Sequence, residues 1–385
     1  MENGKVGLVT LFRDNFGSIL QAYATYNYIS SLGYRCTLLE YDYSMKSIDK
    51  LKMLPVFLYR VLLYKDFWRD YRNGKEATSM DKNLLSKNTK DRMNSFIETT
   101  FEIRKCNRTN IKTIETEFDY FVVGSDQVWN GYSDFAFLTF SKREKRVALA
   151  PSFGKEMVSE YNKKKVAKAL KGFDFLSVRE ESGVGIIKKL TGENALRLSD
   201  PTILLDKNDW RTFSSDGMKK ESYILIHFLN KPNQIAIETI HLYLQSHNCQ
   251  IYCICNKYKE YFEFSNCEFL DIDPCDYVSL IDGANVVFTD SFHSTLFCLN
   301  METQFFTFER QYSHGISQKS RIVDLLDRTG MQSRYIVDKK PNDFDSLGKW
   351  DSDLLFDKDR VQIRKYINDA LMRKGSKEWK NINTY

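Results

Sequence analysis

The chain has 385 residues, of which 42% are hydrophobic and 28% are charged, and its formal net charge at pH 7 is +5. This length favours two domains, and the composition, with 22 Tyr and 27 Phe, is that of a globular protein and not of a disordered one. An excess of 56 basic over 51 acidic side chains is too small to indicate the concentrated basic face of a nucleic-acid-binding protein, so we expect no nucleic-acid partner.

The sequence also argues against a leader and a membrane span. The apolar run Val6–Leu11 is too short for a secretory leader, and no stretch reaches the roughly 18 apolar residues that a span requires. We therefore expect a cytoplasmic protein. Cys249, Cys253, Cys255 and Cys267 form no CxxC pair, which predicts buried thiols and no metal site.

The first forty residues predict a strand, a helix and a second strand. KVGLVTLF is a short apolar run, and the stretch from Ser18 to Leu32 carries apolar residues at helical spacing before Gly33. YRCTLLEY then follows as another apolar run. A βαβ unit of this kind indicates a parallel, doubly wound sheet.

The segment from about 44 to 110 interrupts this pattern and is predicted to be a helical insertion. Within it, Leu51–Arg72 combines an apolar face, including Leu54, Leu58 and Leu62, with flanking Lys and Arg. Such a pattern fits a helix at a membrane surface. It fits a helix packed on the domain equally, so both readings stay open.

Strands followed by loops recur after the insertion, in FDYFVVGSDQVWN, RVALAPSFG, FDFLSVRE and ALRLSDPTILLD. Beyond a polar linker at Lys207–Lys220 the pattern repeats in SYILIHFL, QIYCIC, NVVFTDSFH and TQFFTF. We predict an α/β protein with a Rossmann-like domain over 1–206, a second over 207–345 and a helical tail over 346–385. Two such domains facing a cleft resemble the B-type glycosyltransferase fold, in which ligands bind beyond the carboxyl ends of the strands.

Polar residues cluster where the predicted strands end. Single Ser, Asp or Asn side chains at such places are often helix caps, but several of them converging on one cleft favour a binding site. His293 opens a helix directly after a strand, with Asp290 three residues before it, and a His there can exchange protons near neutral pH. Arg179 ends the strand of SVREESG and could bind an anion together with a helix N-terminus, or pair with Glu180. Gly17 in DNFGS lets the backbone approach a ligand, although no dinucleotide or P-loop motif is present.

Six stretches occur in one order: DNFGSILQAYATYNYI, FDYFVVGSDQVWN, APSFG, SVREESG, SDPTILLD and VVFTDSFHSTLF. Together they resemble the polysaccharide pyruvyl transferase family over roughly residues 5–330. The resemblance implies transfer of the enolpyruvyl unit of phosphoenolpyruvate onto two sugar hydroxyls of a surface polysaccharide precursor, capsular or secreted. The products are a pyruvate ketal and phosphate, and the reaction is expected to need no cofactor and no metal beyond phosphoenolpyruvate as co-substrate.

The resemblance also implies roles for the residues at the strand ends. His293 matches the family's proposed acid/base, and we expect Asp290 to orient it. The expected donor-binding residues are Arg179, Ser291, Ser294, Asn15, Gly17 and Ser18, and the expected acceptor-binding residues are Ser125, Asp126 and Gln127.

Two positions depart from the family pattern. Ser291 stands where some relatives have a donor-binding Arg, and Ser294 stands where Gly is usual. Other cations would then hold the donor, with Arg13, Lys155 and Arg310 as candidates.

Two rival functions remain open: a nucleotide-sugar-dependent glycosyltransferase of the B fold, and a non-catalytic scaffold in a polysaccharide assembly complex. The acceptor sugar and its attachment to a lipid are open as well. A lipid-linked acceptor would suit a peripheral contact of Leu51–Arg72 with the inner face of the membrane.

Overall fold

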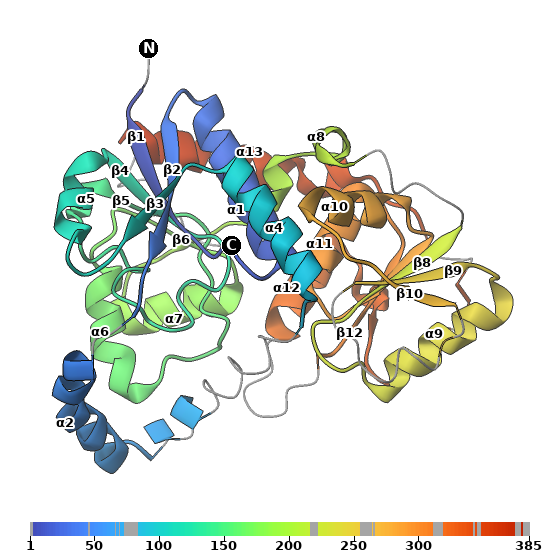
Figure 1. Ribbon diagram of the computed structural model, residues 1–385, viewed down its shortest axis with the longest axis horizontal. Coiled ribbons are helices and arrows are strands. Elements are labelled where there is room, and N and C mark those ends of the chain that lie inside the picture. Colours follow the sequence, from blue (N-terminus) through green and yellow to red (C-terminus); the bar gives the residue numbers. More distant parts are fainter. Residues whose placement is uncertain are drawn as a thin grey trace.

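The computed structural model shows two parallel sheets that lie side by side, with helices packed around them (Figure 1). It describes residues 3–44, 47–65, 67–68, 70–72, 84–215, 222–254, 264, 266–310, 319–341, 343–344, 348–373 and 379. In these parts of the chain, none of the helices has both the length and the apolar character needed to cross a bilayer.

The first sheet has seven strands in the order β3-β2-β1-β4-β5-β6-β7, and every neighbouring pair is parallel. Its strands are β1 (Lys5–Val9), β2 (Arg35–Tyr41), β3 (Ile103–Cys106), β4 (Tyr120–Val123), β5 (Arg146–Ala148), β6 (Phe175–Val178) and β7 (Leu196–Arg197). The helices between the strands of this sheet are α1 (Phe16–Ser31), α2 (Ser47–Leu63), α4 (Lys87–Thr100), α5 (Ile111–Glu117), α6 (Glu160–Leu170) and α7 (Glu181–Thr191).

The second sheet has six strands in the order β10-β9-β8-β11-β12-β13, again all parallel. Its strands are β8 (Tyr223–His227), β9 (Gln250–Ile254), β10 (Cys267–Phe269), β11 (Val286–Thr289), β12 (Phe305–Phe308) and β13 (Tyr335–Ile336). The helices that follow the first sheet are α8 (Lys207–Phe213), α9 (Gln234–Ser246), α10 (Pro274–Gly283), α11 (Phe292–Met301), α12 (Lys319–Thr329) and α13 (Ser352–Leu371).

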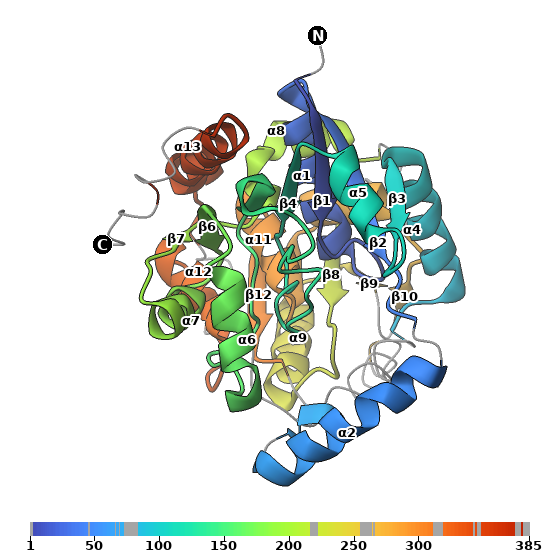
Figure 2. The same ribbon diagram turned by 90° about the vertical axis from the view of Figure 1, so that its left-hand side faces the viewer.

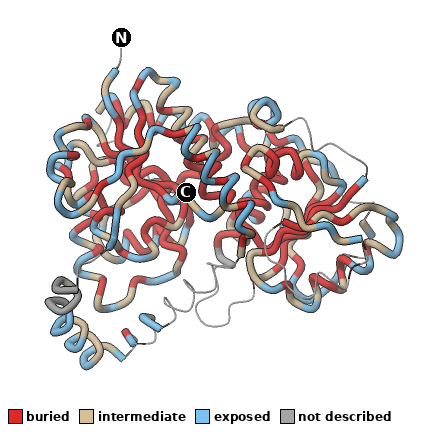
Figure 3. Tube along the Cα trace, in the orientation of Figure 1, coloured by how far each residue is buried: buried red, intermediate tan, exposed pale blue. Residues whose placement is uncertain are grey.

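The central strands are apolar because both faces of a parallel sheet are covered. All four residues of β11 are buried, and Figure 3 shows buried segments running through the middle of each half. Thr289 of β11 lies opposite His227 of β8, so these two strands end at the same level. The loop after β8, which carries Asn230, and the N-terminus of α11 after β11, which carries His293, therefore lie next to each other. This fold confirms the prediction of an α/β protein with two Rossmann-like halves.

Aromatic contacts join the two halves between the sheets. The ring of Phe16 on α1 stacks on Tyr277 of α10, with ring centroids 4.9 Å apart. Trp210 of α8 is fully buried and contacts Tyr23 of α1, with ring centroids 6.0 Å apart. The N-terminus of α1 also lies against the N-terminus of α11, where Gly17 is next to the ring of His293, and the candidate site lies there.

Two details differ from the sequence-based expectation. β3 lies within the predicted helical insertion of 44–110, because Ile103–Cys106 pairs with β2 as an edge strand. The predicted linker Lys207–Lys220 begins with helix α8, which the capping box of Asp206 starts; residues 216–220 lie outside the described residues. The tail is helical as expected over α13 and returns to the first sheet, where Tyr366 Oη donates to the carbonyl of Ala148 (2.8 Å). The domain limits 1–206, 207–345 and 346–385 stay predictions.

Candidate active site

A cavity of about 530 Å³ opens between the two halves, at the carboxyl ends of strands from both sheets. Ligands of open α/β sheets bind at such places. One wall comes from the loops after β1, β2 and β4, and the other from the loops after β8, β11 and β12. The polar and aromatic lining residues include Arg13, Asp14, Asn15, Ser18, Glu40, Tyr41, Tyr43, Asp126, Gln127, Asn230, Ser291, His293, Arg310 and Arg321.

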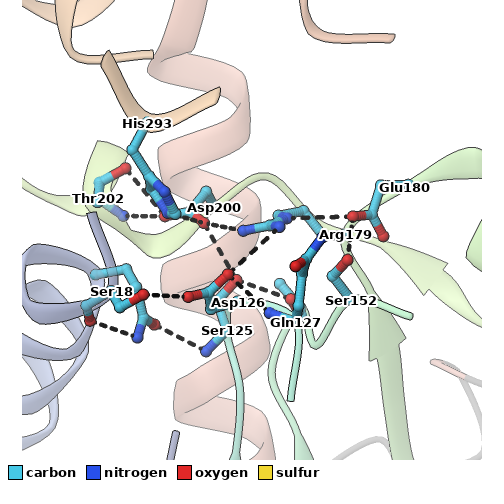
Figure 4. Close-up of polar contacts among 12 residues, drawn as sticks. Ser18, Ser125, Asp126, Gln127, Ser152, Arg179, Glu180, Asp200, Thr202 and His293 are labelled. Carbon is cyan, nitrogen blue, oxygen red and sulfur yellow. Dashed lines mark hydrogen bonds and ion pairs between the residues drawn. The ribbon is translucent and has the colours of Figure 1, made fainter. Parts of the chain in front are cut away.

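His293 lines this cavity from the first turn of α11. Ser291 caps the helix, since its hydroxyl accepts from the Ser294 backbone N–H, and the imidazole is only 6% exposed. Nε2 of His293 lies 3.5 Å from Oδ2 of Asp200, which belongs to the first half of the chain (Figure 4). The candidate acid/base of the second half thus lies beside a carboxylate of the first, at ion-pair distance and without a hydrogen bond.

Gly17 leaves the space that the His293 ring occupies. A Cβ on Gly17 would lie 2.1 Å from Cγ and 2.3 Å from Nδ1 of His293, closer than non-bonded carbon and nitrogen atoms can approach. Gly17 belongs to the first turn of α1, whose N-cap is Asn15. The structure therefore corrects the role expected for Gly17: it accommodates the imidazole and does not itself line the cavity.

Replacing Gly17 with Ala should displace the His293 ring while favouring the helix, because Ala is a better helix former than Gly by about 1 kcal/mol. Since a misplacement of about 1 Å can cost roughly 10²-fold in rate, we expect turnover to fall by about that factor. The matched control is Gly185→Ala on α7, where an added Cβ meets nothing within 4 Å. Equal turnover of both variants and the parent protein would contradict this packing.

Arg179 lies behind the cavity in a buried cluster of opposite charges and is 3% exposed. Its Nη1 donates to Oδ2 of Asp200 (2.6 Å), and its Nε lies 3.4 Å from Oε1 of Glu180. Burial opposes the charge of Arg179, but Glu180 and Asp200 outweigh it and raise the pKa of the guanidinium. Burial likewise opposes ionisation of Asp200, yet His293 and Arg179 hold the pKa of that carboxyl well below its ordinary value. Asp200 is therefore an ionised carboxylate between His293 and Arg179 (Figure 4).

Asp126 is a second carboxylate in the cavity wall. Its backbone is left-handed, with φ 58°, and its Oδ2 accepts from the hydroxyl of Ser18 (2.5 Å). Burial opposes its ionisation, but His293 and then Arg179 lower the pKa of Asp126. Two ionised carboxylates, Asp126 and Asp200, thus lie next to one imidazole.

A family model described as polysaccharide pyruvyl transferase matches residues 15–312. The chain belongs to this family. The matched range contains Asn15, Arg179, Asp200 and His293, so all the parts of the buried cluster lie within the family's shared region. A search of curated proteins finds no match.

Several solved structures are similar to this pyruvyl transferase family member at low identity. A putative UDP-N-acetylglucosamine 2-epimerase from Listeria monocytogenes is 9% identical, with 87% of this chain and 90% of the other covered and a TM-score of 0.48. Arabidopsis thaliana UGT89C1 complexed with UDP-L-rhamnose is 10% identical, with 99% and 98% covered and a TM-score of 0.45. The heptosyltransferase WaaC of E. coli with ADP is 10% identical, with 96% and 99% covered and a TM-score of 0.39.

In this pyruvyl transferase family member the structure brings six of the predicted site residues to the cavity wall: Asn15, Ser18, Asp126, Gln127, Ser291 and His293. Arg179, expected to bind the donor, instead lies behind them, held by buried carboxylates. Of the cations considered as substitutes, Arg13 and Arg310 line the cavity. Lys155 does not, since its ammonium group donates to the carbonyl of Asn130 and lies 5.1 Å from the Tyr132 ring centroid.

Asp290 does not orient His293 as expected. Its carboxylate accepts from the backbone N–H groups of Leu229 (2.7 Å) and Asn230 (3.1 Å) and lies 3.5 Å from Nε of Arg310. Burial raises the pKa of Asp290, although Arg310 and these N–H groups oppose the shift. Asp290 thus fixes the loop after β8 and the position of Arg310, and the carboxylate beside His293 is Asp200.

Two further predicted site residues point into the protein and not into the cavity. The hydroxyl of Ser294 is fully buried, 2.6 Å from Nδ1 of His227 and 2.9 Å from the hydroxyl of Tyr277. Ser125 is also fully buried, and its hydroxyl donates to the carbonyl of Ala150 (2.8 Å). Each contributes to the support of the site, and the expected donor and acceptor contacts of Ser294 and Ser125 are not part of this geometry.

Three lining residues were not predicted from the sequence: Arg321, Tyr41 and Tyr43. Arg321 follows the last matched stretch in an ordinary amphipathic helix, so no sequence signal sets it apart. Tyr41 ends the second predicted strand and Tyr43 follows it in EYDY, and two aromatic residues at a strand end are a usable signal.

Proposed function

We propose that this pyruvyl transferase family member moves the enolpyruvyl group of phosphoenolpyruvate onto two hydroxyls of a sugar in a surface polysaccharide precursor. The products are a cyclic pyruvate ketal and inorganic phosphate. The observation that supports this proposal most strongly is the position of His293: a buried imidazole beside ionised Asp200, in a cavity that three arginines also line.

The donor carries a carboxylate and a phosphate, so its binding requires several cations or N–H donors. Arg13, Arg310 and Arg321 lie in the cavity wall, and the N-terminus of α11 faces the same space through Ser291. Arginine forks match both anionic groups, and a helix N-terminus favours negative charge. These groups take the place of the Arg that some relatives have at position 291.

The chemistry begins with transfer of a proton from the imidazole of His293 to the methylene carbon of phosphoenolpyruvate, which becomes a methyl group. The adjacent carbon gains oxocarbenium character, and one sugar hydroxyl adds to it and returns its proton to His293. The second hydroxyl then replaces phosphate on the same carbon, and its proton leaves with the phosphate. His293 gives one proton and receives one, so it returns to its starting protonation state. General acid–base catalysis of this kind contributes about 10²–10⁴-fold.

The acceptor would lie on the opposite wall, along the residues after β2 and β4. Asp126 and Gln127 offer hydrogen-bond partners for sugar hydroxyls, and Tyr41 and Tyr43 form an aromatic surface with ring centroids 4.8 Å apart. Aromatic faces suit the apolar face of a sugar ring, and the carboxylate of Asp126 suits its hydroxyls.

Thermal-shift measurements with phosphoenolpyruvate and with UDP-sugars test the donor assignment. A ligand that binds only the folded state raises its stability, so we expect phosphoenolpyruvate to raise the melting temperature. Arg310→Met and Arg321→Met should each weaken this binding by about tenfold to a hundredfold, because a hydrogen bond to a charged group contributes roughly 1.5–3 kcal/mol. Arg143→Met, at an exposed pair with Asp174 away from the cavity, serves as the control. Saturable stabilisation by a UDP-sugar, with none by phosphoenolpyruvate, would instead favour a glycosyltransferase.

A further inference from the structure

One face of α2 is apolar and exposed. Leu54, Leu58 and Leu62 follow one another at four-residue intervals and therefore lie on the same side of the helix. Their exposed fractions are 47%, 51% and 84%, and Tyr59 and Leu63 beside them are also more than half exposed. A row of exposed large apolar side chains on one helix is unusual for a surface that faces only water.

The other side of α2 is held by the protein, so the exposed row is not a consequence of a detached helix. Phe57 contacts Phe67 at 5.4 Å, and Arg60 lies 5.7 Å from the ring centroid of Tyr161 on α6. Asp70, just beyond the helix, accepts from the hydroxyls of Ser159 (3.0 Å) and Tyr161 (2.9 Å). Aromatic and polar contacts thus fix which face of α2 points outward.

Two basic helices lie near α2: α6, which α2 contacts at Tyr161, and α7, which lines one cavity together with Leu63 and Lys65. Together α6 and α7 carry six Lys and two Glu. Lys164, Lys168, Lys188 and Lys189 are exposed among them, and Lys65 beyond α2 adds another exposed charge. A partner of this surface should therefore be apolar where it meets α2 and anionic where it meets α6 and α7.

The position of α2 links this surface to the candidate active site. The chain leaves the cavity wall at Tyr43, runs through α2, and returns to the wall at Leu84. Figures 1 and 2 both show α2 at the bottom of the molecule, projecting beyond the two sheets. A partner that contacts α2 would thus meet a helix that a short stretch of chain after Tyr43 connects to the cavity wall.

We propose that α2 is a docking surface for a lipid bilayer that contains anionic lipids. The row of Leu54, Leu58 and Leu62 enters the boundary between headgroups and acyl chains, and the exposed Lys65 next to this row, with the lysines of α6 and α7 behind it, attracts the anionic headgroups. An apolar helix face combined with basic side chains is the composition that binds such a boundary, and each basic side chain near the surface strengthens binding. This inference does not depend on the proposed transfer reaction; if both hold, the cavity faces an acceptor carried by a membrane lipid.

Sedimentation with vesicles tests the docking surface. We expect the full chain to bind vesicles of equal parts phosphatidylglycerol and phosphatidylcholine, and to bind phosphatidylcholine vesicles far more weakly. Leu62→Glu should reduce binding to the anionic vesicles by about tenfold or more, because it removes apolar contact and adds a repelled charge. The matched control is Leu354→Glu on α13, because Leu354 is 85% exposed and Leu62 is 84% exposed. Lys164→Gln with Lys168→Gln should also weaken binding.

The result that overturns the proposal is equal vesicle binding by the parent protein, Leu62→Glu and Leu354→Glu, or no preference for anionic vesicles. The parent protein could instead fail to bind vesicles and form a dimer that Leu62→Glu dissociates. That result would show that a second copy of the chain covers α2. Phosphate release from phosphoenolpyruvate with a water-soluble acceptor should be the same in Leu62→Glu and the parent protein. Failure of docking and failure of the transfer reaction are therefore separable.

Discussion

Replacing His293 with Gln should lower acceptor-dependent phosphate release from phosphoenolpyruvate by about 10²–10⁴-fold. Gln fills similar space and forms hydrogen bonds but cannot carry a proton to the methylene carbon and accept one from the sugar hydroxyl. We expect kcat to fall and KM for phosphoenolpyruvate to change little, because the cations of the cavity remain. Initial rates of phosphate release measure both quantities.

The control for this prediction is His241→Gln. His241 is an exposed residue of α9, where its ring lies 4.6 Å from Phe264 and outside the cavity lining. This variant should keep the parent rate. A His293→Gln protein with near-parent kcat would remove His293 from the chemistry.

Replacing Arg179 with Met should lower the free energy of unfolding by roughly 3–5 kcal/mol, because it leaves buried carboxylates without their cation. Asp200 and Glu180 are 2% and 4% exposed, and both contact the guanidinium. Arg179 also lies over the ring of Phe292, 4.6 Å from its centroid. Phe292 lines the cavity, so the variant also loses a cation–π contact with the cavity wall. Denaturant unfolding measures the effect, with Arg104→Met as control, since the exposed pair of Arg104 and Glu117 should contribute at most about 1 kcal/mol.

The difference in free energy of unfolding between the parent protein and Arg179→Met should depend on pH, in a direction that follows from the pKa shift of Asp200. The folded state lowers the pKa of Asp200, so ionised Asp200 stabilises the protein above the ordinary Asp pKa of about 3.9. That stability is lost as the pH falls toward the lowered value. Without Arg179 the pKa of Asp200 should move up, and the stability difference between parent and variant should be largest near neutral pH and shrink below about pH 4. A raised KM for phosphoenolpyruvate with unchanged stability would instead make Arg179 a donor-binding residue.

The fold could be predicted from the sequence because its strands are short apolar runs that end in polar residues. That pattern also identified His293, Asn15, Ser18 and Asp126 as residues of one cleft. Apolar patterning reports which residues are buried and at which end of a strand a residue stands. Both properties are local, so a single sequence contains them.

Contacts between distant segments could not be predicted in this way. Asp290 lies three residues from His293 and was an obvious partner, but the turn at Ser291 directs its carboxylate to the loop after β8. The carboxylate that contacts His293 is Asp200, from the other half of the chain. The sequence predicts that Gly17 lets the backbone approach a ligand, whereas in the structure its missing side chain leaves room for the His293 ring. Such pairings depend on the relative position of the two halves of the chain, and the local pattern of apolar and polar residues holds no information about that position.

The central claim is that the cavity around His293 joins phosphoenolpyruvate to a sugar as a ketal. Mass spectrometry of products formed from phosphoenolpyruvate and a panel of soluble and lipid-linked glycans tests it most directly. We expect one acceptor to gain the mass of a pyruvate ketal, with one phosphate released per ketal formed, and no such product with His293→Gln. An acceptor that instead gains a sugar from a nucleotide-sugar donor, with phosphoenolpyruvate left unconsumed, would contradict this account.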